Sequence, residues 1–187
     1  MKVVLASQSP RRKQLLSYLV DEFEQQPADI DETPLVEETP SEYVARLAEG
    51  KAQVIAAKSQ PGTVVIGSDT TVVGKGQILE KPVDLDDCKR MLLALSGTSH
   101  EVLTAFSVIR DQHIVTKVVS TEVVFREVTE QDITEYWHTG EPQDKAGAYA
   151  LQGIGGKFVE KVNGSVSSVV GLPLVELEQV LKEVISK

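Results

Sequence analysis

The sequence has a single cysteine, Cys88, and this scarcity excludes two kinds of architecture. A disulfide framework needs cysteines in pairs, and a cysteine-based zinc site needs several of them at short spacing. The three histidines, His100, His113 and His138, also lack the spacing of metal ligands. Cys88 falls on the apolar face of a predicted helix, so we expect an inert core residue.

Long apolar runs and an excess of positive charge are also missing. The longest apolar stretches, such as Val169–Val175, are too short to span a membrane and contain Gly and Pro. The first residues lack the apolar region of a secretory signal, so we expect a cytoplasmic protein without a membrane partner. The net charge of −9 argues against nucleic acid as a partner, because phosphate backbones attract basic surfaces.

The common motifs of nucleotide binding and serine hydrolysis are absent. The chain contains no G-x-x-x-x-G-K-[ST] loop, no G-x-G-x-x-G after a strand, and no G-x-S-x-G elbow. Any catalytic site must therefore be built from other residues.

The residues that are present predict one α/β domain over residues 1–187. Hydrophobic residues make up 41% and charged residues 25% of the chain, as in ordinary globular proteins. Capping and periodicity predict helices that start at Ser9, Thr39, Asp84, Thr129 and Pro173. Apolar or β-branched runs predict strands at 2–6, 63–67, 71–73, 77–79, 100–110 and 114–125. Long strands with interspersed helices favour a mixed sheet.

The first candidate site lies where the first strand leads into a helix, at Leu5–Arg12 (LASQSPRR). Free N–H groups at a helix start favour anions and disfavour cations. Arg11 and Arg12 stand in that first turn, which makes sense if an anion binds in front of them. Two solvated surface arginines are the alternative.

Lys51 is the second candidate, because helical periodicity places it among apolar residues. Val44, Leu47 and Ile55 define the apolar face of its predicted helix, and Lys51 falls in the middle of that face. An ammonium there must either extend along the surface to reach water or meet an anion.

Asp69 is the third candidate, predicted to follow directly after the buried strand 63–67. Ligands of open α/β sheets bind outside the carboxyl ends of strands. A carboxylate there can hold a metal or accept a proton from water. A turn-forming Asp is the alternative.

Three further segments carry weaker signals. Glu80-Lys81-Pro82 follows a predicted strand, and Asp29, Asp31 and Glu32 form an acidic cluster that suits a hard cation or is merely solvated. The segment 140–156 is rich in Gly and Ala, which permits close approach of the backbone to a ligand or simply makes a flexible loop.

The order of seven motifs along the chain resembles the Maf family. These motifs cover nearly the whole chain and are LASQSPRR (5–12), RLAEGKA (46–52), GSDT (67–70), EKP (80–82), LSG (95–97) with His100, GEPQDKAGAY (140–149) and GSVSSVVGLPL (164–174). The resemblance implies a twisted mixed α/β sheet flanked by helices, with two lobes around a central cleft, similar to inosine triphosphate pyrophosphatases. It also implies a homodimer. Ser68 departs from the usual Ala, and Val166-Ser167-Ser168 replaces a more aromatic and amide-rich stretch.

The resemblance also implies an activity and a set of site residues. Maf proteins hydrolyse a nucleoside triphosphate to the monophosphate and pyrophosphate with a divalent metal, Mg²⁺ or Mn²⁺. By motif, the chain has a catalytic proton acceptor (Asp69), phosphate-binding residues (Ser7, Arg11, Arg12, Lys51, Lys81), residues that mark the dTTP and UTP branch (Arg11, Thr70, Gln152), and acids near the metal (Glu32, Asp69).

Three readings of the function follow. The first is dTTP and UTP hydrolysis in cleaning of the nucleotide pool, by metal-assisted attack of water on the α-phosphate. The second is a pyrophosphatase for inosine, xanthosine or modified nucleotides. The third is a nucleotide-binding regulator of septum formation without hydrolysis, which the presence of Asp69 disfavours because a pure binder needs no such acid.

Overall fold

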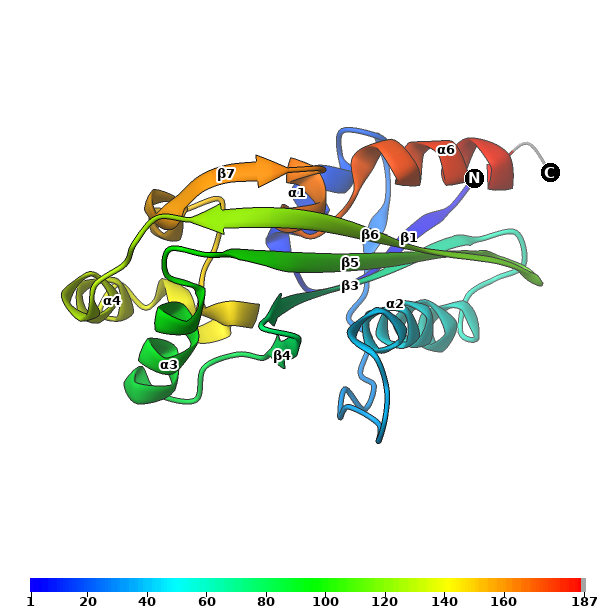
Figure 1. Cartoon of the computed structure of the whole chain (residues 1–187). Coiled ribbons are helices and arrows are strands. Elements are labelled where there is room, and N and C mark those ends of the chain that lie inside the picture. Colours follow the sequence, from blue (N-terminus) through cyan, green and yellow to red (C-terminus); the bar gives the residue numbers. More distant parts are fainter. Residues whose placement is uncertain (186–187) are drawn as a thin grey trace. The chain divides into compact units, whose positions relative to one another are not determined.

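The computed structural model of the chain describes residues 1–185 and shows a mixed α/β fold (Figure 1). The sheet has seven strands in the order β2-β1-β3-β5-β6-β7, and β4 pairs with β3. The strands are β1 Val3–Ala6, β2 Glu24–Gln25, β3 Val64–Gly74, β4 Gln77–Leu79, β5 Ser99–Arg110, β6 His113–Phe125 and β7 Val159–Asn163. The helices are α1 Pro10–Leu16, α2 Pro40–Ala56, α3 Leu85–Leu95, α4 Glu130–Trp137, α5 Val166–Val170 and α6 Leu174–Ile185. Three short 3-10 helices lie at Glu141–Asp144, Ala146–Ala148 and Ile154–Phe158.

The sheet contains both parallel and antiparallel strand pairs. A tight turn can join only antiparallel neighbours, whereas parallel neighbours need a longer connection. β1 runs parallel to β2 and β3, with Val3 opposite Val64 and Ala6 opposite Gly67. β4 is antiparallel to β3, since the two strands are joined by the tight turn at Lys75 and Gly76, both with positive φ. The predicted mixed sheet with flanking helices is therefore confirmed. None of the helices in residues 1–185 has the length and hydropathy to cross a membrane.

The chain divides into two compact units. The first contains 1–69, 104–119 and 171–187, and the second contains 70–103 and 120–170. In the first, α2 and α6 flank the strands (Figure 1), and its core includes Val4, Ala52, Ile55, Val65 and Ile109. In the second, α3 packs beside α4 over a core rich in aromatic residues, including Phe125, Tyr136, Tyr149 and Phe158.

The predicted helix starts are confirmed. Ser9 caps α1 by accepting the backbone N–H of Arg12, and Thr39 and Thr129 form capping boxes with Glu42 and Asp132. Such reciprocal caps satisfy N–H groups that have no partner within the helix. Cys88 is fully buried on α3, and burial raises the pKa of its thiol to about 11, so it is the inert core residue that was expected.

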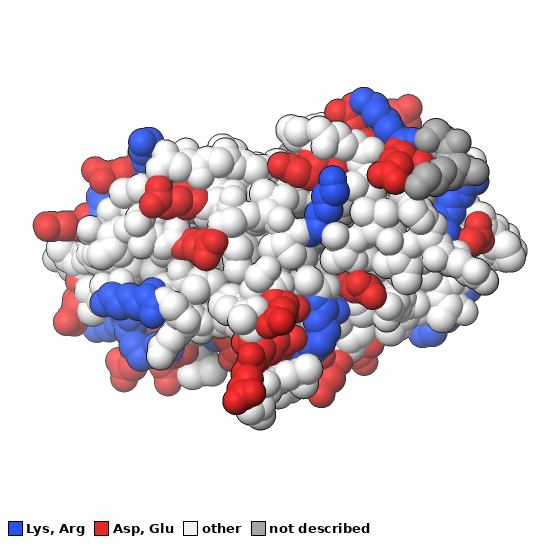
Figure 2. Space-filling model, turned by 45° about the vertical axis from the view of Figure 1, so that its right-hand side comes forward, with Lys and Arg blue, Asp and Glu red and all other residues white. Residues whose placement is uncertain are grey.

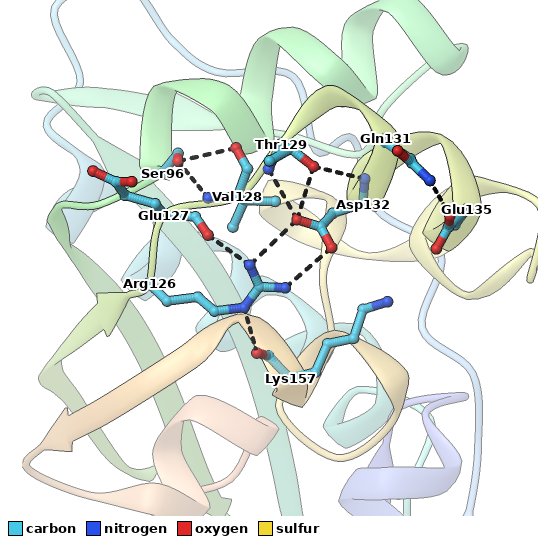
Figure 3. A network of polar contacts seen from close by, with 9 residues as sticks. All are labelled: Ser96, Arg126, Glu127, Val128, Thr129, Gln131, Asp132, Glu135 and Lys157. Carbon is cyan, nitrogen blue, oxygen red and sulfur yellow. Dashed lines mark hydrogen bonds and ion pairs between the residues drawn. The ribbon is translucent and has the colours of Figure 1, made fainter.

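The end of β6 is tied to α4 by a network around Arg126 (Figure 3). Arg126 Nη2 lies 3.2 Å from Asp132 Oδ1, and its Nε donates to the carbonyl of Lys157 at 3.0 Å. The hydrogen bonds from Arg126, and after them the N–H of Thr129, hold the pKa of Asp132 well below its usual range. The network therefore joins the last strand before α4 to both the helix cap and the segment that leads into β7.

Charged side chains of both signs are distributed in small groups over the face drawn in Figure 2. Acidic residues outnumber basic ones in the chain, 28 to 19. Any site for an anion in this protein therefore depends on cations that are gathered locally within an acidic chain.

Candidate active site

Asp69 lies inside β3 rather than after its end. The prediction that a strand ends at Gly67 and leaves Asp69 at its carboxyl end is wrong, because β3 continues to Gly74. The β-branched residues Thr70, Thr71 and Val72 extend the strand, and Gly67 does not end it. Asp69 is 9% exposed, and its backbone belongs to a regular strand.

Gly67 is required because α2 packs directly against β3 at this point. A Cβ at Gly67 would lie 2.2 Å from the carbonyl oxygen of Ala48 and 2.7 Å from the backbone nitrogen of Ala52. These two residues flank Lys51 on α2. The close backbone approach therefore brings Lys51 next to the strand that carries Asp69.

Lys51 meets two carboxylates. Its ammonium lies 2.7 Å from Asp69 Oδ1 and 2.6 Å from Glu32 Oε1. The Lys51 side chain is 11% exposed and the Asp69 side chain 13%, whereas that of Glu32 is 50% exposed. The sequence left open whether Lys51 extends to water or meets an anion. In the structure it meets an anion.

Only Glu32 of the predicted acidic cluster reaches this group. Asp31 instead accepts the backbone N–H of Thr33 at 2.9 Å, which is a local turn contact. The segment around Glu32 is held against α2, where Tyr43 donates to the carbonyl of Glu32 at 3.0 Å.

Arg12 belongs to the same group. Its Nε donates to the carbonyl of Gly171 at 2.9 Å, which fixes the side chain of a residue in the first turn of α1. Burial lowers the pKa of Arg12, and the positive charge of Arg11 lowers this pKa further. The negative charges of Asp69 and Glu32 act in the opposite direction. A guanidinium remains charged even so. The first unit thus brings Arg12, Glu32, Lys51 and Asp69 together, and Arg11 precedes Arg12 on α1.

Gly171 connects Arg12 to β3. Its carbonyl also accepts the hydroxyl of the fully buried Ser68, at 3.0 Å, and that hydroxyl lies 2.8 Å from the carbonyl of Ala105. The hydroxyl of Ser68, where the family usually has Ala, is therefore satisfied by backbone carbonyl acceptors in the core. Gly171 was not predicted as a site residue; the only signal was its place in the motif at 164–174.

Ser7 serves the turn between β1 and α1. Its hydroxyl accepts the N–H of Ser9 at 3.1 Å, and the residue is 7% exposed. The structure shows a local contact for Ser7, so its phosphate-binding role stays a prediction.

Three predicted site residues belong to the second unit. Thr70 is half-buried in β3, and Lys81 is exposed just beyond β4. The end of β4 is fixed by a hydrogen bond from the N–H of Gly147 to the carbonyl of Glu80, 3.1 Å long. Gln152 is exposed in the loop before the 3-10 helix at Ile154.

The glycines of the segment 140–156 make room for the protein's own side chains. A Cβ at Gly153 would lie 2.5 Å from Glu141 Oε2, and a Cβ at Gly155 would lie 2.4 Å from the Tyr136 hydroxyl. The close approach predicted for a ligand is therefore made by Glu141 and Tyr136. Sequence reasoning missed both residues, although Glu141 stands in the GEPQ motif.

The donor set of the first unit fits a magnesium-type ion. Glu32 and Asp69 each offer a carboxylate oxygen within 2.7 Å of one shared cationic nitrogen, that of Lys51. No group of three His, Cys, Asp or Glu side chains suited to a metal occurs within residues 1–185. Mg²⁺ does not need one, because it is commonly held by one or two carboxylates together with substrate phosphates. Glu32 and Asp69 are thus the residues that would hold it.

The chain belongs to the family of Maf-like proteins, whose model matches residues 2–184. It is 49% identical over 184 residues to the dTTP/UTP pyrophosphatase of Vibrio vulnificus, with 98% of this chain and 99% of the relative covered. It is 50% identical over 184 residues to the dTTP/UTP pyrophosphatase of Hahella chejuensis, with 97% and 92% covered.

A similar fold occurs in the Ham1 protein of Staphylococcus aureus. The TM-score is 0.56 at 14% identity, and the match covers 98% of this chain and 99% of the Ham1 chain. At that identity the likeness concerns the fold alone.

Proposed function

We propose that this chain hydrolyses dTTP and UTP to the nucleoside monophosphate and pyrophosphate. The observation that carries the proposal is the group of Arg12, Lys51, Glu32 and Asp69 in a Maf-like chain. Relatives about half identical over nearly their full length bear the name dTTP/UTP pyrophosphatase. The group contains the two elements that phosphoryl hydrolysis needs, which are cations and an acid.

The reaction assigns each residue of the group a task. The oxygen of water bonds to the α-phosphorus, and the bond from that phosphorus to the bridging oxygen breaks, so that pyrophosphate leaves. Asp69 accepts or orients the proton of the water. Arg12 and Lys51 bind phosphate oxygens and stabilise the charge on the leaving pyrophosphate, a task that the family motifs also assign to Arg11 and Lys81. A divalent metal, when bound by Glu32 and Asp69, supplies further neutralisation of the triphosphate.

Gln152 accounts for the choice of base. A carboxamide can donate to a carbonyl oxygen and accept from an N–H group at the same time. Uracil and thymine present this pair at adjacent positions. Gln152→Glu should reduce kcat/KM for UTP without a comparable loss of thermal stability, and an equal loss on every nucleotide would contradict the assignment.

A panel of nucleoside triphosphates tests the proposed function. The protein is incubated with each triphosphate and Mg²⁺ or Mn²⁺, and both monophosphate and pyrophosphate are measured. We expect the fastest release from dTTP and UTP, and none after chelation of the metal. Preference for inosine or xanthosine triphosphate would overturn the substrate assignment.

Asp69→Asn separates an enzyme from a nucleotide-binding regulator. The variant should bind nucleotide but release pyrophosphate at least 100-fold more slowly, as for the loss of a general base. Asp86→Asn, at an exposed position of α3, is the matched control and should keep full activity. Binding without hydrolysis by the wild-type protein would favour the regulator.

The resemblance to the family also leads us to propose a cytoplasmic homodimer that cleans the nucleotide pool. Light scattering coupled to size exclusion tests the oligomeric state.

A further inference from the structure

The loop that carries Gln152 is tied at both ends to one pair of side chains. Before Gln152, the N–H of Ala150 donates to the Tyr136 hydroxyl at 3.3 Å. After Gln152, the N–H groups of Ile154 and Gly155 donate to the two oxygens of Glu141, both at 2.9 Å. The Tyr136 hydroxyl itself donates to Glu141 Oε1 at 2.7 Å. The two ends of the loop are thus connected through a single Tyr–Glu hydrogen bond.

Glu141 acts here as a fixed anion inside its own protein. Burial would raise the pKa of its carboxyl, but the donors Gly155, Ile154 and Tyr136, with the charge of Lys145, keep the pKa below its usual range. Burial, and then Glu141, raise the pKa of Tyr136, so its hydroxyl keeps the proton that it donates. Hydrogen bonds to an ionised acceptor are stronger than neutral ones.

Gln152 stands outside this network. Its side chain is exposed and, within residues 1–185, has no hydrogen-bond partner. Gly153 has a φ of 156° and Gly156 closes a turn onto the carbonyl of Gly153 at 3.2 Å, so the backbone next to Gln152 is specified closely. The amide of Gln152 is therefore accessible from outside the protein, on a loop whose backbone is held in place.

We propose that Glu141 and Tyr136 are positioning residues that hold Gln152 for recognition of the uracil or thymine base. The inference rests on the proposed function, since it assigns a base to Gln152. Neither side chain needs to touch the nucleotide: both act through the backbone on either side of Gln152. Because they hold the loop before the base binds, they lower the entropic cost of ordering it on binding.

Glu141→Gln tests the proposal with little change of shape. The new NH₂ group would face the N–H of Ile154 or Gly155, so at least one of the three hydrogen bonds is lost. We expect kcat/KM for UTP to fall about tenfold, roughly the effect of one charge-assisted hydrogen bond. The loss should appear in KM rather than in kcat, and hydrolysis of a poor substrate such as GTP should change little. Tyr136→Phe keeps the ring in the core and should give a smaller loss of the same kind.

A double-mutant cycle with Gln152→Ala distinguishes positioning from general stability. If Glu141 acts through Gln152, Glu141→Gln has no further effect on UTP hydrolysis once Gln152 is Ala. Additive losses, or equal losses on UTP and GTP, would overturn the proposal. Glu135→Gln, an exposed change of the same charge on α4, is the matched control and should behave as wild type.

Amide hydrogen exchange gives a readout that does not depend on activity. Exchange at residues 150–155 should rise in Glu141→Gln and Tyr136→Phe relative to wild type, with the rest of the second unit unchanged. Unchanged exchange would overturn the proposal even if the enzyme were impaired. If wild type hydrolyses no pyrimidine triphosphate, the proposed function fails. Raised exchange in the variants would then show that Tyr136 and Glu141 hold the loop, but not for recognition of uracil or thymine.

Discussion

Lys51 shows how far one buried charge depends on its partners. Its ammonium has two carboxylates, whereas Asp69 has Lys51 as its direct ion-pair partner and Arg12 as a further nearby charge. Removal of one member of a buried pair leaves the other without compensation, and removal of the shared ammonium also leaves two carboxylates, Asp69 and Glu32, facing each other. The two charges of the pair should therefore respond unequally to mutation.

Lys51→Met should destabilise the fold more than Asp69→Asn. The first leaves the buried carboxylate of Asp69 facing Glu32, and breaking such a pair typically costs about 3 kcal/mol. The second leaves Lys51 with Glu32 and should cost about half as much. Urea unfolding of both variants and of wild type measures the difference. The reverse order would show that the ammonium is the more costly charge to bury.

The contact between α2 and β3 places these charged residues at the scale of whole elements. The sequence indicated that Lys51 lies on the apolar face of its helix, because periodicity is a local property. It did not indicate the partner, because the contact at Gly67 is made across the fold. The same limit explains the error at Asp69: Gly67 was interpreted as a strand end when its lack of a side chain serves packing.

Gly67→Ala should impair both stability and catalysis. The added Cβ would meet backbone atoms of Ala48 and Ala52, which have no flexible end to move. We expect a loss of about 3 kcal/mol and a fall in kcat, because α2 and Lys51 must shift away from Asp69. Gly50→Ala is the matched control: its Cβ would meet only the end of the Ile30 side chain at 3.4 Å. That change lies inside a helix and should be neutral or stabilising. A Gly67→Ala variant as stable and active as this control would contradict the argument.

The Arg126 network should make the second unit sensitive to acid. The pKa of Asp132 is lowered in the folded state, so its contribution is complete above the unfolded pKa of about 4 and is lost as pH falls toward the folded pKa. Arg126→Met removes the cause of the shift. Wild type and variant should therefore differ in urea stability at pH 7 and become more alike below pH 4. A constant difference across this range would mean that the network contributes through packing alone.

At the scale of the molecule, an acidic chain has to bind a polyanion. The net charge is −9, and the cations that serve the substrate are few. The divalent metal that we propose would offset part of this repulsion, so nucleotide and metal should bind together more tightly than either alone. The sequence could predict, through motifs far apart in the chain, that Arg12 and Lys51 lie near the same carboxylates, and the places of Arg11 and Lys81 at the site stay a prediction. It could not reveal Glu141 or Gly171, whose roles arise from backbone contacts that have no local pattern.

A non-hydrolysable analogue should stabilise the protein only in the presence of metal. At about 100 times its Kd, a ligand adds about 2.7 kcal/mol, which corresponds to an increase in Tm of about 5–10 °C for a chain of this size. The α,β-imido analogue of UTP with Mg²⁺ should give this increase, and EDTA should abolish most of it. Glu32→Gln should require more Mg²⁺ for the same increase in Tm. Equal increases with and without metal would argue against a metal held by Glu32 and Asp69.

The Tyr136–Glu141 pair also has a practical consequence for inhibitors. Clustered backbone N–H groups ordinarily attract sulfate, phosphate or acidic drugs, but those of Ile154 and Gly155 already serve a resident carboxylate. A compound designed to bind that loop gains nothing from an added acid there. It should instead present a neutral edge that matches the amide of Gln152.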